Sequence, residues 1–345
     1  MRYIGNKTRL VPFLLGTVEE LGLRPGQACD PFAGTASVGR ALKAEGWQVH
    51  CGDLMAMSYA LQVANVVLDA APAETVDALA QLNELPGKPG FVTEHFTPEG
   101  IAGQVHGRMY FTPENASKID PIRERIAEWE ENGSLTADAV QYLLACLIKA
   151  ADRVANTTGV YASFVKSWQP NALKPFRLTP LAPPPPGGHV GPCTAFRGSA
   201  QARVGDIGSV DLLYLDPPYN QRQYPGYYHV PEILARGWWP APELRGKTGL
   251  MPDRELRSDW CRPSRCAAAL RGLLDAADAR HVFLSYNDEG LLSPEEIEDI
   301  LTTYGRADSY RQFRHEYRRY RSDSDRPGRQ YRRNGVAELV HYVGC

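Results

Sequence analysis

Four short apolar runs in this chain each end in a polar residue, and stretches with helical periodicity lie between them. The runs are residues 27–30, 47–53, 210–216 and 281–286, and the helical stretches are residues 36–45, 57–68 and 266–277. The third run is almost continuously apolar, as expected for a strand that is covered on both faces of a parallel sheet. This alternation of strand and helix predicts an α/β fold with a three-layer parallel sheet.

The ends of these runs indicate where chemistry is to be expected. Asp30, Asp53, Asp216 and Tyr286 stand at the carboxyl ends of the four predicted strands. Ligands of open α/β sheets bind beyond that edge of the sheet. We therefore expect a functional site there.

Composition narrows the class of protein. The 345 residues suggest one large domain or two modest ones, and 38 basic against 40 acidic residues exclude a polycation but not a local basic patch. The seven cysteines form no Cys-x-x-Cys pair, which disfavours a disulfide framework and a metal site. No apolar run approaches the roughly 20 residues that cross a bilayer, and Glu19 and Glu20 interrupt the only signal-like segment. We expect a cytoplasmic protein without a membrane partner or a metal.

Residues 85–190 break the alternation. Two helices are predicted at residues 119–131 and 136–155, and a proline run followed by glycines ends the segment as a linker. We interpret residues 85–190 as an insertion into a discontinuous domain formed by residues 1–84 and 191–345.

The C-terminal stretch 306–333 is rich in arginine. It holds ten arginines against four acids, with aromatic residues interleaved. Cations suit phosphates and flat rings suit unstacked bases, so the stretch is consistent with nucleic-acid binding. A solvated arginine-rich loop, or a tail whose aromatic residues pack on the sheet, explains it equally well.

The sequence Asp216-Pro-Pro-Tyr-Asn220 follows the most apolar strand. It can be a plain turn, in which the prolines end the strand. Alternatively, the Asp216 carboxylate and the Pro217 carbonyl are two hydrogen-bond acceptors at a fixed separation, and Tyr219 adds a stacking face. That combination suits an exocyclic amine on a planar base, and the strand context strengthens this interpretation.

The loop Asp30-Pro-Phe-Ala-Gly34 indicates a nucleotide-like cofactor. No Gly-Lys-Ser/Thr follows, which excludes a phosphate-binding P-loop, and Asp30 would repel the pyrophosphate of a dinucleotide. A carboxylate instead attracts the ammonium and sulfonium groups of S-adenosylmethionine. Asp53 is placed to accept hydrogen bonds from ribose hydroxyls, or else to cap a helix.

Together these segments resemble the N6-adenine-specific DNA methylase family, alpha group. The resemblance rests on Tyr3-Ile-Gly-Asn-Lys7, Asp30-Pro-Phe-Ala-Gly34, Asp53 and Asp216-Pro-Pro-Tyr219, in this order, with a variable region between the second and fourth motifs. It implies a Rossmann-like, S-adenosylmethionine-dependent methyltransferase sheet. The insertion would then be a mainly helical target-recognition region.

The resemblance also implies roles for single residues. Tyr3 and Lys7 would contact the cofactor, while Asp30, Phe32 and Gly34 would hold its methionine end and Asp53 its ribose. Asp206 would meet the adenine of the cofactor. Asp216 and Pro217 would accept from the target N6, and Tyr219 would stack on the adenine.

The implied activity is site-specific methylation of a flipped adenine in double-stranded DNA, in a restriction-modification or an orphan system. A companion restriction endonuclease is a possible partner. An RNA base methyltransferase and a catalytically silent DNA-binding regulator on the same fold stay open as alternatives. Cytosine N4 methylation usually goes with serine in place of Asp216 and ranks lower.

Overall fold

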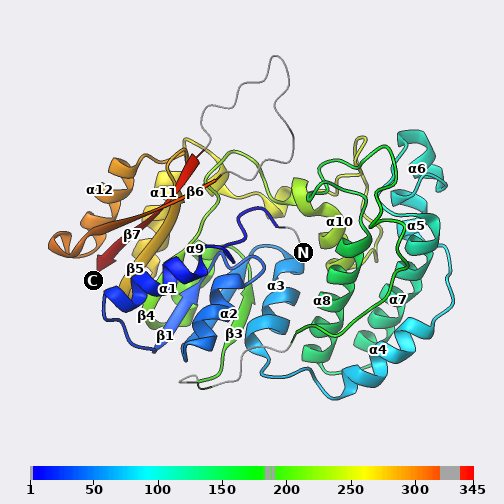
Figure 1. Ribbon diagram of the computed structural model, residues 1–345, viewed down its shortest axis with the longest axis horizontal. Coiled ribbons are helices and arrows are strands. Elements are labelled where there is room, and N and C mark those ends of the chain that lie inside the picture. Colours follow the sequence, from blue (N-terminus) through cyan, green and yellow to red (C-terminus); the bar gives the residue numbers. More distant parts are fainter. Residues whose placement is uncertain (1–2, 183–187, 189–190, 319–334) are drawn as a thin grey trace, which may run out of the picture.

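The structure, a computed structural model, describes residues 3–182, 188, 191–318 and 335–345 (Figure 1). Its centre is a seven-stranded sheet in the order β3-β2-β1-β4-β5-β7-β6. The strands are β1 (Gln27–Asp30), β2 (Gln48–Asp53), β3 (Thr194–Arg197), β4 (Ser209–Leu215), β5 (Asp278–Asn287), β6 (Arg311–Arg318) and β7 (Gly335–Gly344). Strands β1 to β5 are parallel, and β7 pairs antiparallel with both β5 and β6.

Helices cover both faces of the sheet, which confirms the predicted three-layer α/β fold. On one face, Leu14 of α1 (Val11–Glu20) and Leu42 of α2 (Ser37–Ala44) pack against Leu212 and other side chains of the sheet. On the other face, α9 (Ala200–Arg203), α11 (Cys266–Ala276) and α12 (Pro294–Tyr304) pack over Leu213 and Leu215. Because β4 contributes apolar residues to both layers, its sequence is almost continuously apolar.

A group of helices lies beside the sheet (Figure 1). It comprises α3 (Ala56–Gln62), the π-helical turn η1 (Val63–Val67), α4 (Glu74–Glu84), α5 (Phe91–Phe96), α6 (Ile101–His106), α7 (Pro113–Glu131), α8 (Ala137–Val154) and α10 (Pro225–Arg236). One apolar core joins them, with Leu61 of α3, Leu147 of α8 and Ile233 of α10 all buried in it. The core therefore draws on both sides of the proposed insertion 85–190, whose boundaries stay a prediction.

The four predicted strands are confirmed as β1, β2, β4 and β5, and the predicted helices as α2, α3 with η1, α7, α8 and α11. Three strands, β3, β6 and β7, were not predicted from the sequence. β3 is only four residues long, and β6 and β7 lie in and after the arginine-rich stretch.

Part of the arginine-rich stretch 306–333 is a strand and not a loop. Arg311–Arg318 forms β6, the edge strand of the sheet, which pairs with β7 on one side. Phe313 packs against the α1 side of the sheet, and the Tyr310 hydroxyl lies 2.8 Å from Nδ1 of His341 on β7. Arg319 and Arg321 of the same stretch lie outside the described residues.

Candidate active site

Three acidic side chains meet at one edge of the sheet. Asp30 ends β1, Asp53 ends β2, and Asp216 directly follows β4. Strand β1 lies between β2 and β4. The chain passes from β1 to β2 on one side of β1, and it later forms β4 on the other side. Such a switch point is where ligands bind in open parallel sheets.

A cavity of about 250 Å³ opens at this point. It brings together seven of the residues expected from the sequence, which are Tyr3, Lys7, Asp30, Phe32, Gly34, Asp53 and Asp216. The predicted convergence of these segments on one pocket is therefore present in the fold.

The N-terminal segment lies across the loop that follows β1. The Tyr3 ring stacks on Tyr228 of α10 with 4.7 Å between centroids, and the backbone N–H of Ile4 donates to the Tyr228 hydroxyl at 2.6 Å. Gly34 has a φ of +51°, and a Cβ at this position would lie 2.9 Å from a carbon of the Tyr3 ring. Only glycine permits both this backbone conformation and this close contact.

Lys7 joins two carboxylates at the base of the cavity. Its Nζ lies 3.0 Å from Oδ1 of Asp216 and also pairs with Glu338 of β7. The Ser285 hydroxyl of β5 donates to the same Glu338 at 2.6 Å. The side chains of Lys7, Asp216 and Glu338 are 5%, 14% and 2% exposed, so these charges are held largely out of water.

The carboxyl groups around the cavity are hard to ionise. Burial raises the pKa of Asp216 to about 7, against the opposing effect of Lys7, and burial raises the pKa of Asp53 to about 6. Burial and then the charge of Asp216 raise the pKa of Asp30 well above its usual range. A cation bound in the cavity would stabilise the ionised form of these carboxyl groups, so the site favours a positively charged ligand.

Asp53 organises the backbone around it. Its two carboxylate oxygens accept from the N–H groups of Gly34, at 3.1 Å, and Met55, at 2.8 Å. The first N–H groups of α3 are instead satisfied by Glu232 of α10, which accepts from Ala56 at 3.0 Å and from Met57 at 2.9 Å. Asp53 is therefore not the cap of that helix.

The Asp-Pro-Pro-Tyr segment turns away from the sheet after β4. Pro218 lines the cavity, whereas Pro217 and Tyr219 are not among its lining residues. The Tyr219 ring meets the edge of Tyr286, with 6.3 Å between centroids. Pro217 and Tyr219, which the family resemblance places at the target base, lie beside the cavity in the structure.

A second loop, residues 255–260, also lines the cavity, and no sequence pattern indicated it. Trp260 lies edge-on to Phe32 with 4.9 Å between centroids. Gln223 and Ser258 exchange two hydrogen bonds, of 3.0 and 2.8 Å, between side chain and backbone. These contacts attach the loop to the segment that follows Asp216.

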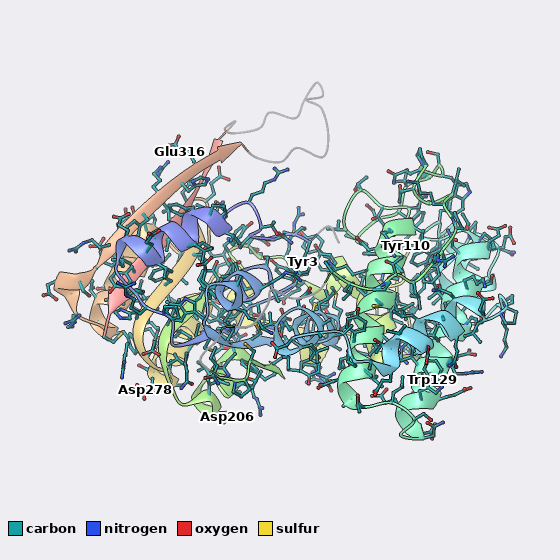
Figure 2. The ribbon with its side chains drawn as sticks, turned by 60° about the horizontal axis from the view of Figure 1, so that its bottom comes forward. Tyr3, Tyr110, Trp129, Asp206, Asp278 and Glu316 are labelled. Carbon is teal, nitrogen blue, oxygen red and sulfur yellow. The ribbon has the colours of Figure 1, made fainter. Side chains whose placement is uncertain are left out.

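Asp206 is not brought to the cavity. It lies in the 3₁₀ turn η2 (Val204–Ile207), which precedes β4, and its exposed carboxylate pairs with Arg203 at 3.2 Å. Figure 2 shows Asp206 near Asp278, the first residue of β5, and away from Tyr3. Ser199 and Gln201, which follow the carboxyl end of β3, line the cavity instead. Recognising β3 in the sequence would have found them.

Among the described residues, no three His, Cys, Asp or Glu side chains group as metal ligands would. A search of the same residues finds no helix with the length and apolar character of a membrane span.

The sheet order and the acidic cavity at its switch point define the class of Rossmann-like methyltransferases. Residues 3–300 match the family of D12 class N6 adenine-specific DNA methyltransferases, and the chain belongs to this family.

The chain is also similar to proteins that are named as methyltransferases. The chain is 35% identical to the Type II methyltransferase M.NlaIII of Neisseria lactamica, over 99% of both chains. It is 31% identical to the Type II methyltransferase M.CviAII of Paramecium bursaria Chlorella virus 1, over 89% of both. It is 33% identical to the Type II methyltransferase M.FokI of Planomicrobium okeanokoites, and there it spans only 50% of the relative.

Among solved structures, a putative RNA methyltransferase from Pyrococcus horikoshii matches at 10% identity with a TM-score of 0.31, covering 97% of this chain and 84% of that one. A likeness of this size carries no argument about function.

Proposed function

We propose that this protein transfers the methyl group of S-adenosylmethionine to N6 of an adenine in a specific sequence of duplex DNA. The observation that carries the proposal is that Asp30, at the end of β1, and Asp216, directly after β4, line one cavity, with Lys7 paired to Asp216. The family of N6 adenine-specific DNA methyltransferases supports the choice of base.

The cavity suits the cofactor. S-adenosylmethionine supplies a sulfonium methyl group and carries two positive charges near its methionine end. Asp30, whose pKa is raised mainly by burial and then by Asp216, gains a partner from such a ligand. We assign Asp30, Phe32 and Gly34 to that end of the molecule, and Asp53 to the ribose.

The backbone around Gly34 supports this assignment. Gly34 leaves room for the Tyr3 ring to close over the loop, where any side chain would collide with it. Tyr3 and Lys7 would thereby contact the cofactor from the N-terminal segment. Backbone N–H groups of Gly34 and Met55 hold the Asp53 carboxylate in place where it lines the cavity, and a ribose hydroxyl would donate to it there.

Asp216 acts on the target amine. Its ion pair with Lys7 engages Oδ1, and we assign Oδ2, together with the Pro217 carbonyl, to the hydrogens of the adenine N6. Two fixed acceptors favour a more tetrahedral nitrogen with a lone pair available for attack. The remaining contribution is positioning of the reacting atoms.

The adenine must leave the duplex to reach this cavity, at a cost of about a few kcal/mol in lost stacking. Stacking on Tyr219 would return part of that cost. Because Tyr219 lies beside the cavity, the Asp-Pro-Pro-Tyr segment would adjust when the base enters.

The names of the relatives support a biological setting. Two further relatives are called modification methylases, LlaI of Lactococcus lactis at 32% identity and StsI of Streptococcus sanguinis at 29%. We therefore propose a restriction-modification role, with a restriction endonuclease as the companion enzyme.

A transfer assay tests the proposal. Tritium from labelled S-adenosylmethionine is followed into duplex DNA and into RNA, with the wild type, Asp216→Asn and Asp278→Asn. Asp278 is an exposed aspartate at the opposite end of the sheet and serves as the matched control. We expect label in DNA with the wild type and the control, and a loss of about a hundredfold or more with Asp216→Asn.

Label in RNA alone would identify an RNA methyltransferase. Binding of DNA without any transfer would identify a silent regulator. Either result overturns the proposed function.

A further inference from the structure

Glu338 stands behind the proposed catalytic carboxylate. It lies on β7, beyond residues 3–300 that match the family, and its partners are Lys7 and Ser285. Three parts of the chain far apart in sequence thus meet in one buried network of charges. The pairing of β7 between β5 and β6 is what brings Glu338 there.

The stability of the fold alone does not explain why the Glu338 carboxylate is buried beside Lys7. A buried charge stabilises a fold weakly, because losing its water costs about as much as the ion pair returns. Asp216 by itself would neutralise Lys7. The second carboxylate leaves the network with an excess negative charge next to the cavity.

We infer that Glu338 is a positioning residue which, through Lys7, holds the Asp216 carboxylate as a strong hydrogen-bond acceptor for the target amine. This inference rests on the proposed function. An ammonium shared between two carboxylates withdraws less charge from each than one held by a single partner. With Glu338 present, Asp216 is fixed in place by Lys7 and still accepts strongly.

The electrostatics of the site agree with this geometry. Burial opposes the charge of Lys7, but Asp216 and then Glu338 raise its pKa well above the usual value, so it stays an ammonium. Asp216 is surrounded by charged and titratable groups from every neighbouring segment, namely Lys7, Asp30 on β1, Tyr214 on β4, Tyr224 before α10 and Glu338 on β7. Two other carboxyl groups act on Asp216, those of Asp30 and Glu338, and of these two Glu338 is the one that pairs with Lys7.

The test variant, Glu338→Gln, removes the charge of Glu338 and keeps the size of its side chain. In Glu338→Gln the amide has the size of the carboxylate, and Lys7 then pairs with Asp216 alone. The titration of Asp216 is followed by carbon-13 NMR of labelled aspartate, with Asp216→Asn to assign the signal. We expect its midpoint to fall by about one pH unit, as a neighbouring like charge is removed.

Methyl transfer gives the second measurement. In Glu338→Gln, the acidic limb of kcat/KM against pH should move down by about the same amount, and single-turnover transfer at pH 8 should slow about tenfold. KM for DNA and cofactor affinity should stay within about twofold. Glu338→Asp keeps the charge on a shorter side chain and should retain the midpoint more closely. If Glu338→Gln does not fold, Glu338→Met, which also lacks the charge, takes its place, and the same fall in the Asp216 midpoint is expected.

His341→Gln is the matched control, because it changes another fully buried polar side chain of β7. It should lower the melting temperature without moving the Asp216 midpoint. A Glu338→Gln protein with an unshifted midpoint, or with a shift equal to that of His341→Gln, overturns the inference. If the Asp216 midpoint shifts in Glu338→Gln but the wild-type protein transfers no methyl group, the proposed function is overturned. The electrostatic effect of Glu338 on Asp216 would then still hold.

Discussion

Among single residues, Asp216 should make folding stability depend on pH. Its pKa is raised by burial to about 7 in the folded state, against about 4 in an unfolded chain. Between these values the folded state holds more protons than the unfolded state, so the free energy of unfolding should fall as pH rises from about 4 to 7. Asp216→Asn should flatten that slope, measured by urea unfolding of the ligand-free protein. Equal slopes in both proteins would show that Asp216 is ionised normally.

The site residues differ in how far sequence could predict them. Asp30, Asp53 and Asp216 each end a strand of recognisable apolar pattern, so their meeting at one edge followed from the fold class. Glu338 gave no such signal, because a lone acid in an apolar strand shows its partner only when β7 pairs next to β5. Asp206 was misplaced for a related reason, since β3 went unrecognised and the residues that follow it were not considered.

At the scale of elements, the loop after β1 depends on one glycine. Gly34→Ala should destabilise the fold by about 1–2 kcal/mol through its positive φ, and should also displace Tyr3 and weaken cofactor binding. Gly22→Ala is the matched control, because Gly22 has a φ of +67° and nothing within 4 Å of an added Cβ. The control should show the loss of stability by thermal melting but bind cofactor normally by calorimetry. Equal cofactor affinities in the two variants would contradict the role of the Tyr3 contact.

Helix α3 is held at its start by a residue of α10. Glu232 is buried and accepts from the N–H groups of Ala56 and Met57, just after Asp53. Glu232→Ala leaves both donors without their acceptor and should lower the free energy of unfolding by about 2–4 kcal/mol. Urea unfolding measures this loss, with the exposed Glu84→Gln as the surface control. A loss of less than about 0.5 kcal/mol would mean that water or another group satisfies the helix end.

Strands and helices with clear periodicity were predictable, and the edge of the sheet was not. Strand β4 was recognisable because both faces are buried, which makes its pattern continuous. Strand β6 is the edge strand of the sheet and is rich in charged residues. Its sequence therefore resembles that of a solvated loop, and only its pairing with β7 shows that it is a strand.

At the scale of the molecule, the helical group beside the sheet is our candidate for reading the DNA sequence. Residues 85–190 interrupt the strand-helix alternation and can vary without disturbing the sheet. Exchanging them for the corresponding segment of a relative with another target should change the methylated sequence, mapped by sequencing of methylated plasmid DNA. Because α3 and α10 share the apolar core of this group, the hybrid must keep the side chains that face them. An active hybrid with the original specificity would contradict the assignment.

Mass spectrometry of the methylated nucleoside identifies the atom that receives the methyl group. Duplex DNA is incubated with the protein and S-adenosylmethionine carrying a deuterated methyl group, digested to nucleosides, and analysed by mass spectrometry against synthetic standards. We expect deuterated N6-methyladenine as the labelled nucleoside with the wild type, and none with Asp216→Asn. Label in N4-methylcytosine, or undiminished N6-methyladenine in the Asp216→Asn reaction, would contradict it.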